Sequence, residues 1–284
     1  MLRVATILCI ILASAACRRS PPASPAADST GVVVNSAGAG KFIAEYEPAD
    51  PDYSEFRSGL VAHRFLDTIA SRLNDSLLIP RNITLRTAHC GEPNASYNPD
   101  DRRVTLCYEL FRALSEQFAT EEGGDYLVSG TVVFALMHEL GHALIHVLDL
   151  PITGREEDAV DQLATVLLLQ QGPSGDSLAF GAVAWFASDA HRSQLDALEF
   201  ADDHGFDLQR VYNIICWIHG RDPRAYPELV EDGWLPAHRR DRCPAEYHRL
   251  AVSWRRLLSP YRRVSATGTS TDNAAGRRRN ASGE

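Results

Sequence analysis

Two histidines lie four residues apart in the sequence HELGH, with a glutamate between them: His138, Glu139 and His142. On an α-helix, residues four apart share one face and are separated by about 6 Å along the axis. Two imidazoles in this arrangement are able to bind one Zn²⁺, and Glu139 then projects beside the open coordination position. There it can take a proton from a metal-activated water and pass it to a leaving amine. The spacing therefore predicts the chemistry of the H-E-x-x-H metallopeptidases.

A third metal ligand must come from outside this pair. One class of these enzymes carries Gly three residues and His six residues after the second motif His. This chain has Ile145 and Leu148 there, so that class is excluded. His146 repeats the four-residue spacing but lies about 6 Å further along the helix. We therefore predict that His146 is a surface residue or an outer contact of the site, and not a ligand.

Four acids in the following segment are the candidates for the third ligand. Thr153 and Glu156 match the capping box S/T-x-x-E, which predicts that Glu156 caps the N-terminus of a helix. Glu157 and Asp161 lie one turn apart on the flank of that helix, whereas Asp158 points further towards solvent. Such a pair allows Glu157 to bind the metal and Asp161 to orient a metal-binding His through its second ring nitrogen. The residues favour Glu157, and they leave Asp161, Glu156 and Asp158 open as alternatives.

Peptide hydrolysis also needs a donor for the oxyanion and a place for the peptide backbone. The segment ADDHGFDLQRVYN offers His204, Arg210 and Tyr212, of which His204 is the favoured catalytic candidate. The alternative for each is an ordinary capping, surface or core residue. We also predict that residues 102–109, RRVTLCYE, form an edge strand along which an extended peptide could lie.

The elements that must position these residues begin with a mixture of strand and helix. Residues 41–48 alternate in polarity and predict a strand, and residues 55–75 have helical periodicity. Residues 82–90 and 102–109 are rich in β-formers and are separated by the turn-rich segment 91–101. We expect these two segments to pair as antiparallel strands.

The remainder of the chain is mostly helical. The segment 123–130, GGDYLVSG, is expected to separate two helices, and Pro151 is expected to end the helix that carries HELGH. The predicted helices are 110–122, 131–150, 153–172, 176–191, 207–220 and 244–259.

The N-terminus, MLRVATILCIILASAAC, combines one Arg, an apolar run and small residues. This pattern is typical of a secretory signal peptide, here residues 1–16. The run ASAAC resembles a bacterial lipobox, which predicts lipidation of Cys17; cleavage nearby by ordinary signal peptidase is the alternative. Arg18 stands where an acid would retain the lipoprotein at the inner membrane. We therefore expect an exported lipoprotein of the outer membrane that faces the periplasm.

The sequence predicts one folded domain between two flexible segments. Residues 17–40 are rich in Ala, Ser, Pro and Gly and predict a lipid-anchored tether. Residues 265–284 contain no aromatic or large aliphatic residue, so a disordered tail is expected at 264–284. The domain is then expected at residues 41–263.

Four cysteines remain once Cys9 of the signal peptide and Cys17 are set aside. An even number of cysteines in an oxidising compartment indicates two disulfides. Three pairings exist, and we favour the two that are local in sequence, Cys90–Cys107 and Cys216–Cys243. A zinc site made of all four is disfavoured because the chain contains no C-x-x-C.

The charge of the chain limits its partners. The 284 residues carry a net charge of −9, which argues against nucleic acid or an anionic membrane surface as partner. Hydrophobic residues make up 45%, enough for a soluble globular core. We expect no internal stretch that is long and apolar enough to span a bilayer, so membrane association is expected only through the lipid anchor.

Four segments together carry a resemblance: HELGHALI, LPITGREEDAVDQLA, YNPDDRRVTLCYEL and QRVYNIICWIHGRDP. Over residues 41–260 the chain resembles the bacterial putative metallopeptidase domain family of exported proteins. The resemblance implies a zincin-like α+β fold, a peptidase activity, one Zn²⁺ and a peptide or protein substrate. The E-x-x-x-D pair also resembles that of the gluzincins. That resemblance implies that Glu157 is the third ligand and that Asp161 supports a metal-binding His.

Together these patterns predict an α+β, zincin-like domain with a small N-terminal antiparallel sheet, an active-site helix and a mainly helical C-terminal part. The expected function is zinc-dependent hydrolysis of peptide bonds in the bacterial envelope. The alternative is a non-catalytic zinc- or peptide-binding envelope lipoprotein on a peptidase fold. The intact Glu139 argues against that alternative, because a degenerate site is expected to lose its catalytic base first.

Overall fold

The computed structural model describes residues 40–192 and 203–263. The chain divides into a first unit, Met1–Val33, and a second, Val34–Glu284, which holds every described residue. The expected signal peptide, Cys17, the tether up to residue 39 and the C-terminal tail lie outside the described residues.

Four strands form one mixed sheet in the order β1-β2-β4-β3. The strands are β1 (Phe42–Tyr46), β2 (Ile83–Ala88), β3 (Ala95–Asn98) and β4 (Arg103–Cys107). β1 pairs with β2 and β2 with β4 in parallel, whereas β3 pairs with β4 antiparallel. Together with the helices, this sheet gives an α+β fold that is mostly helical.

The expected antiparallel sheet is therefore wrong. Residues 82–90 and 102–109 pair in parallel, with Leu85 opposite Val104. Between them the chain forms β3 out of a segment whose turn residues hide a strand of four residues. A tight reversal follows, in which Arg102 has a positive φ of 57°. Because β3 occupies the edge, β4 lies inside the sheet, and the prediction that 102–109 is an edge strand is also wrong.

Three short helices between β1 and β2 cover the sheet, and a fourth comes directly after β4 in the chain. They are η1 (Pro51–Tyr53), α1 (Ser54–Ala62), α2 (Phe65–Ser76) and α3 (Tyr108–Gln117). The single helix predicted at 55–75 is two helices, because Arg64 adopts a left-handed conformation with φ of 50°. After this break, α2 buries Leu66 and Ala70 beside β1.

The central helix is α4, Gly124–Leu148. It begins at Gly124. The prediction that residues 123–130 separate two helices is therefore wrong, because of these residues only Gly123 lies outside α4. α4 is long and apolar enough to cross a bilayer by length and composition, yet 78% of its most apolar window is buried inside the protein. The expectation that no internal stretch is long and apolar enough is therefore wrong. Burial of α4 in the protein core accounts for its apolar composition.

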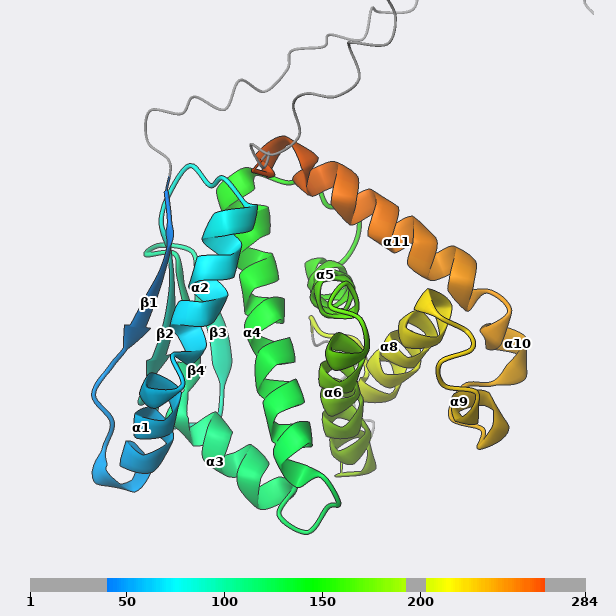
Figure 1. Ribbon diagram of the computed structural model, residues 1–284, viewed down its shortest axis with the longest axis horizontal. Coiled ribbons are helices and arrows are strands. Elements are labelled where there is room, and N and C mark those ends of the chain that lie inside the picture. The colour runs from blue at the N-terminus through cyan, green and yellow to red at the C-terminus, as the bar shows by residue number, and fades with distance from the viewer. Residues whose placement is uncertain (1–39, 193–202, 264–284) are drawn as a thin grey trace, which may run out of the picture. The chain divides into compact units, whose positions relative to one another are not determined.

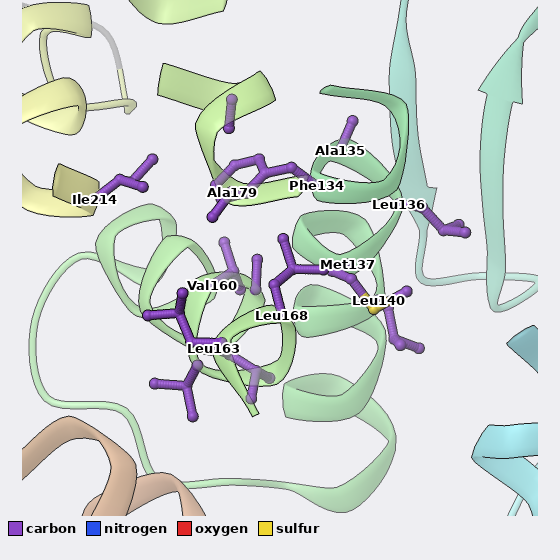
Figure 2. Packing of buried hydrophobic residues seen from close by; sticks show 14 of the residues in the cluster. Phe134, Ala135, Leu136, Met137, Leu140, Val160, Leu163, Leu168, Ala179 and Ile214 are labelled. Carbon is purple, nitrogen blue, oxygen red and sulfur yellow. The ribbon is translucent and has the colours of Figure 1, made fainter. Parts of the chain in front are cut away.

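Helices from the second half of the chain lie on the side of α4 that points away from the sheet, and the first two of them pack directly on α4 (Figure 1). The long ones are α5 (Glu156–Leu169), α6 (Pro173–Arg192), α8 (Asp207–Arg221) and α11 (Cys243–Leu258). Shorter ones are α9 (Glu228–Glu231), α10 (Ala237–Arg240) and η2 (Ser259–Tyr261). Figure 2 shows apolar side chains of α4, α5, α6 and α8 meeting in one core, among them Phe134, Leu140, Val160, Leu163, Ala179 and Ile214.

Both predicted disulfides are confirmed. Cys90–Cys107 joins the segment after β2 to the end of β4, and Cys216–Cys243 joins α8 to the start of α11. Each pair links segments that are adjacent in the fold and close in sequence, with separations of 17 and 27 residues. Such short loops close at modest entropic cost, which is why the sequence-local pairing was the better prediction.

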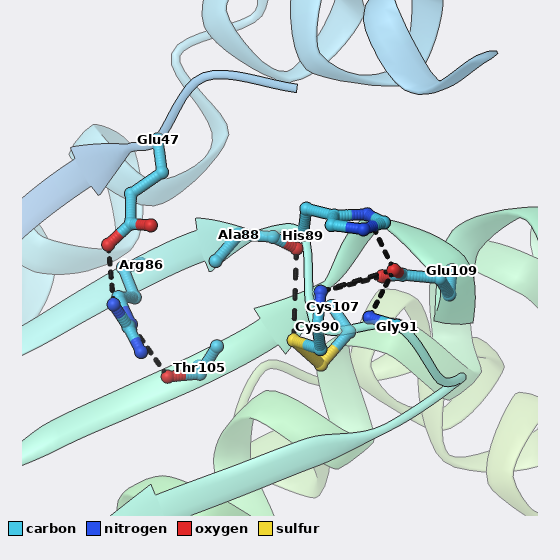
Figure 3. The surroundings of a disulfide bond; sticks show 9 residues. All are labelled: Glu47, Arg86, Ala88, His89, Cys90, Gly91, Thr105, Cys107 and Glu109. Atoms are coloured by element: carbon cyan, nitrogen blue, oxygen red, sulfur yellow. Dashed lines mark hydrogen bonds and ion pairs between the residues drawn. A yellow bond between two sulfur atoms is a disulfide. The ribbon is translucent and has the colours of Figure 1, made fainter. Parts of the chain in front are cut away.

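A buried carboxylate organises the chain around the first disulfide (Figure 3). Glu109 Oε1 accepts hydrogen bonds from the N–H groups of Gly91 at 2.6 Å and Cys90 at 3.1 Å, and it lies 2.7 Å from His89 Nδ1. Burial raises the pKa of the Glu109 carboxyl, but the backbone N–H groups around it lower the pKa more. The pKa of Glu109 therefore lies below its ordinary value.

Replacing Glu109 with Gln is expected to lower the free energy of unfolding at pH 7 by about 1–3 kcal/mol, because buried donors lose a charged acceptor. The carboxylate stabilises the fold above its unfolded pKa, about 4.3, and this contribution is lost as pH falls through the lower folded pKa. The difference between the two proteins should therefore shrink below about pH 4.

Urea denaturation at neutral pH and at about pH 3.5 measures this difference. The control is Glu116→Gln, which changes an exposed acid on the same helix, α3. Equal unfolding free energies for Glu109→Gln and Glu116→Gln at pH 7 would contradict the role of Glu109.

Candidate active site

The site is built where α4 and α5 run side by side. α4 carries His138, Glu139 and His142, and α5 carries the predicted acids. Gly141 makes the close approach of the two helices feasible, because a Cβ there would lie 2.8 Å from the side chain of Val160. The glycine of HELGH therefore has a packing role, which brings the flank of α5 to the histidine face of α4.

Glu157 lies between the two motif histidines. Its Oε2 is 3.1 Å from His138 Nε2, and its Oε1 is 3.3 Å from His142 Nε2. The two imidazole rings lie 5.1 Å apart between centroids, nearly perpendicular to each other. The fold thus brings His138 and His142 to the two carboxylate oxygens of Glu157, and His204 joins His138 and Glu157 in a group whose possible ligand atoms all lie within 4.8 Å of one another.

The other nitrogen of each ring contacts a second acid. His138 Nδ1 lies 2.8 Å from Asp161 Oδ1, and His142 Nδ1 lies 2.7 Å from Glu156 Oε1. Carboxylates accept hydrogen bonds, so both Nδ1 atoms donate, and each Nε2 atom is the ring nitrogen that faces Glu157. Asp161 therefore stands where it was predicted to support a histidine.

Glu156 does not have the predicted capping role. α5 begins at Glu156 with Arg155 as the N-cap residue, and no side chain caps the helix. Thr153 is exposed in the connection from α4. The capping-box prediction is wrong because Glu156 turns towards His142, on the neighbouring helix. Among the described residues, Glu156 thus supports His142 as Asp161 supports His138.

The cluster fits a cation. Glu157 Oε2 is buried and also lies 3.0 Å from His204 Nε2, yet it makes no hydrogen bond of ordinary geometry among the described residues. Carboxylate and imidazole lone pairs that face one another at about 3 Å repel unless a proton or metal ion lies between them. Two His and one Glu form the ligand set of open catalytic zinc sites. A second cluster, Cys90, Cys107 and Glu109, does not fit, because its thiols form a disulfide.

Electrostatics show how strongly the site favours positive charge. Burial lowers the pKa of His138, but Asp161 and Glu157 raise it more, to about 9. Burial raises the pKa of Glu157, but its contacts with His138, His142 and His204 lower it more, to well below the usual range. The carboxylates thus stay ionised and hold positive charge at this point, as a metal centre requires.

Glu139 lies apart from this cluster and lines the adjoining cleft. Burial raises the pKa of its carboxyl, and the nearby positive histidines oppose that effect without cancelling it. A carboxylate with a raised pKa is more basic than an exposed one, which suits a group that accepts and then returns a proton.

Arg210 of α8 holds Asp161 in place. Its guanidinium donates to Asp161 Oδ2 at 2.8 Å and to Oδ1 at 2.9 Å, and it stacks 3.8 Å above the ring of Phe186. Arg210, an alternative oxyanion donor in the sequence, also lines the cleft, and two of its N–H groups donate to Asp161. Tyr212, the other alternative, is 39% exposed and does not line the cleft.

His204 lies at the mouth of the site, before α8. Its side chain is 49% exposed, and its ring stacks on His138 at 6.0 Å between centroids. Arg155 holds this segment through hydrogen bonds to the carbonyl oxygens of Asp203 and His204, the latter at 2.6 Å. The structure thus places His204 within reach of both the ligand cluster and the cleft. His146 lies outside the cluster, with Nδ1 2.7 Å from Tyr97 Oη.

A cleft of about 1460 Å³ opens over the site. Its walls are the edge strand β3, the histidine face of α4, Trp185 of α6 and the segment 204–210. The edge strand that flanks the motif helix is therefore β3, which supplies Tyr97 to this wall. The volume is that of a binding site for a peptide-sized molecule.

Asp161→Asn is expected to lower metal affinity by about 10–100-fold, because an amide no longer fixes the ring of His138 as a charged acceptor does. Competition with a chromophoric chelator measures this affinity, and circular dichroism shows whether the variant is folded. Asp158→Asn, one turn before Asp161 on α5, is the matched control and should bind metal as the parent protein does. Unchanged affinity in the Asp161 variant would contradict its supporting role.

Three features of the site were not predicted from the sequence: Glu156 as a partner of His142, Arg210 as a partner of Asp161, and β3 as a wall of the cleft. The capping-box pattern concealed the first, and no local pattern links Arg210 to an acid 49 residues away. A usable signal for β3 was the alternation of ASYN, in which every second side chain is half-buried.

Comparison with known proteins agrees with this geometry. Residues 46–258 match the family described as "Putative metallopeptidase". No curated protein and no solved structure matches the chain. The match runs from the end of β1 to the end of α11 and includes every residue of the site described above. The chain therefore belongs to this putative metallopeptidase family.

Proposed function

We propose that this protein is a zinc-dependent metallopeptidase of zincin-like fold and gluzincin type. The observation that carries the proposal is the approach of His138 and His142 to the two carboxylate oxygens of Glu157, with Glu139 beside them in the cleft. His138, His142 and Glu157 would hold the metal, and the contacts of Asp161 and Glu156 with the two rings support this assignment.

Each residue has a defined task in hydrolysis. A zinc ion at this site would supply Lewis-acid activation of the attacking water and of the scissile carbonyl. Glu139 accepts the proton of the water at its carboxylate and returns it to the leaving amine nitrogen. His204 donates from its imidazole to the oxygen on which negative charge develops. Among the described residues β3 is the sheet edge beside the cleft, and an extended peptide can pair with it as an added strand.

The proposed place of action is the bacterial envelope. The pattern of residues 1–16 and the ASAAC run support export and lipidation at Cys17, and Arg18 supports the outer membrane. The two disulfides fit an oxidising compartment.

A broad peptide library tests the proposed activity on the purified, metal-loaded protein. We expect cleavage that a chelator abolishes and that added Zn²⁺ restores. Chelator-resistant cleavage would contradict a metal-dependent mechanism. A protein that binds one Zn²⁺ and cleaves no peptide would favour the non-catalytic alternative.

A further inference from the structure

The C-terminal part of the fold is strongly basic although the chain is acidic. Residues 239–263 contain eight arginines and two acids, in a protein with a net charge of −9. The whole-chain charge therefore conceals a local surface of opposite sign. A concentrated patch of one sign determines local binding more than the net charge does.

Three of these arginines share the outer face of α11. Arg242, Arg249 and Arg256 are seven residues apart, so successive side chains are rotated by only about 20° and lie about 10 Å apart along the helix. The opposite face of α11 is buried, through Ala251 and Trp254, against the rest of the domain. All three arginines are exposed.

These side chains have no acidic partners in the part of the chain that the structure describes. Arg239 and Arg240 do pair, with Glu246 at 3.2 Å and with Asp241 at 2.9 Å. Those two pairs use both acids of the segment and leave the outer face of α11 positively charged. An unpaired row of guanidinium groups matches phosphate oxygens in charge and in hydrogen-bonding geometry.

The first described residue, Gly40, lies at the same end of the fold as the C-terminal end of α11. Gly40 N donates to Ile79 O at 2.7 Å, and Arg263 N donates to Ser76 O at 2.9 Å. The first and last described segments thus meet beside residues 76–79, at the end of α11 (Figure 1).

Further positive charge surrounds this point. Lys41 and Arg81 lie beside Gly40, and Arg262 and Arg263 follow α11; all four are exposed. Asp75 is the exposed acid next to Ser76. The positive surface of α11 therefore continues to the point where the N-terminal segment enters the domain.

We propose that the arginine face, defined as Arg242, Arg249, Arg256, Arg262 and Arg263, docks on the anionic phospholipid headgroups of the membrane that carries the protein. A tether of the kind predicted from the sequence for residues 17–40 would have a root-mean-square span of about 25 Å, so it would hold the domain near the membrane without fixing its orientation. Attraction between the arginine face and anionic lipid supplies that orientation. The proposal uses the proposed lipid anchor and does not depend on catalysis.

Vesicle binding of the full chain with Cys17→Ser tests the face separately from any acyl anchor. We expect sedimentation with vesicles of phosphatidylglycerol and phosphatidylcholine, weak binding to phosphatidylcholine alone, and loss of binding at high salt. The double change Arg249→Gln, Arg256→Gln should lower the partition coefficient on the order of thirtyfold, about fivefold for each arginine.

The matched control is Arg64→Gln with Arg224→Gln, which removes the same charge from exposed sites on the α1–α2 and α8–α9 connections. This control should bind vesicles as the parent does, and both variants should unfold at the parent temperature. Equal loss in the two double variants would overturn the proposal, as would absence of binding to anionic vesicles. A dimer that only the Arg249 and Arg256 changes dissociate would instead assign the face to a second copy of the chain.

Discussion

Glu139→Gln is expected to lower kcat/KM for peptide hydrolysis by about 10²–10⁴-fold while the metal stays bound. Gln has the size of Glu but cannot accept the proton of the attacking water or return it to the leaving amine. Glu139 lies in the cleft and is not among the atoms that gather between His138, His142 and Glu157, so metal affinity should not fall.

The measurement pairs steady-state kinetics on one cleaved peptide with metal analysis of the same preparation. Glu116→Gln on α3 makes the same chemical change at an exposed position and should retain full activity. Undiminished hydrolysis by the Glu139 variant would exclude Glu139 as general base. Loss of both metal and activity would instead make Glu139 a residue that builds the site.

Glu157→Gln should have the largest effect on metal binding. We expect the metal affinity of this variant to fall by more than the roughly 10–100-fold expected when a residue that supports a metal-binding His is changed, because here a proposed direct ligand becomes a neutral amide. Hydrolysis should fall with the bound metal at limiting metal concentration. Isothermal titration, or competition with a chelator of known affinity, measures the change.

Two neighbours of Glu157 make this prediction specific. Glu156→Gln alters the adjacent residue, which contacts only the outer nitrogen of His142, so its effect should be smaller. His204→Ala should lower kcat more than metal affinity, because we assign its imidazole to the developing oxyanion. If the His204 variant loses metal while the Glu157 variant retains it, the third ligand is His204.

Several features followed from local sequence alone. The four-residue spacing of His138 and His142 placed both on one helix face, and α4 carries them as expected. The local pairings of the four cysteines were correct. Glu157 and Asp161 were the acids favoured for the site, and both contact His138 there. These features depend on helix periodicity or on short loops, which neighbouring residues define.

Other features were wrong because they depend on distant segments. The parallel pairing of β2 with β4 requires β3 at the sheet edge, and turn-rich residues concealed that strand. Residues 124–130 look like a helix break, yet they form the start of α4. Of these residues Gly130 is buried against α6, where a Cβ would meet the backbone of Leu178 at 2.6 Å. Tertiary packing there outweighs the weak helix propensity of glycine.

The sequence by itself determined that His138 and His142 share one helix face with Glu139 beside them, because helix geometry alone sets the spacing of HELGH, and it narrowed the third ligand we propose to four acids. Only the tertiary structure decided how those groups are held. Glu156 faces His142 because α5 packs closely on α4 over Gly141. Arg210 holds Asp161 across 49 residues because α8 packs beside α5. Such contacts join side chains whose separation in sequence carries no period, so only the packed helices bring them together.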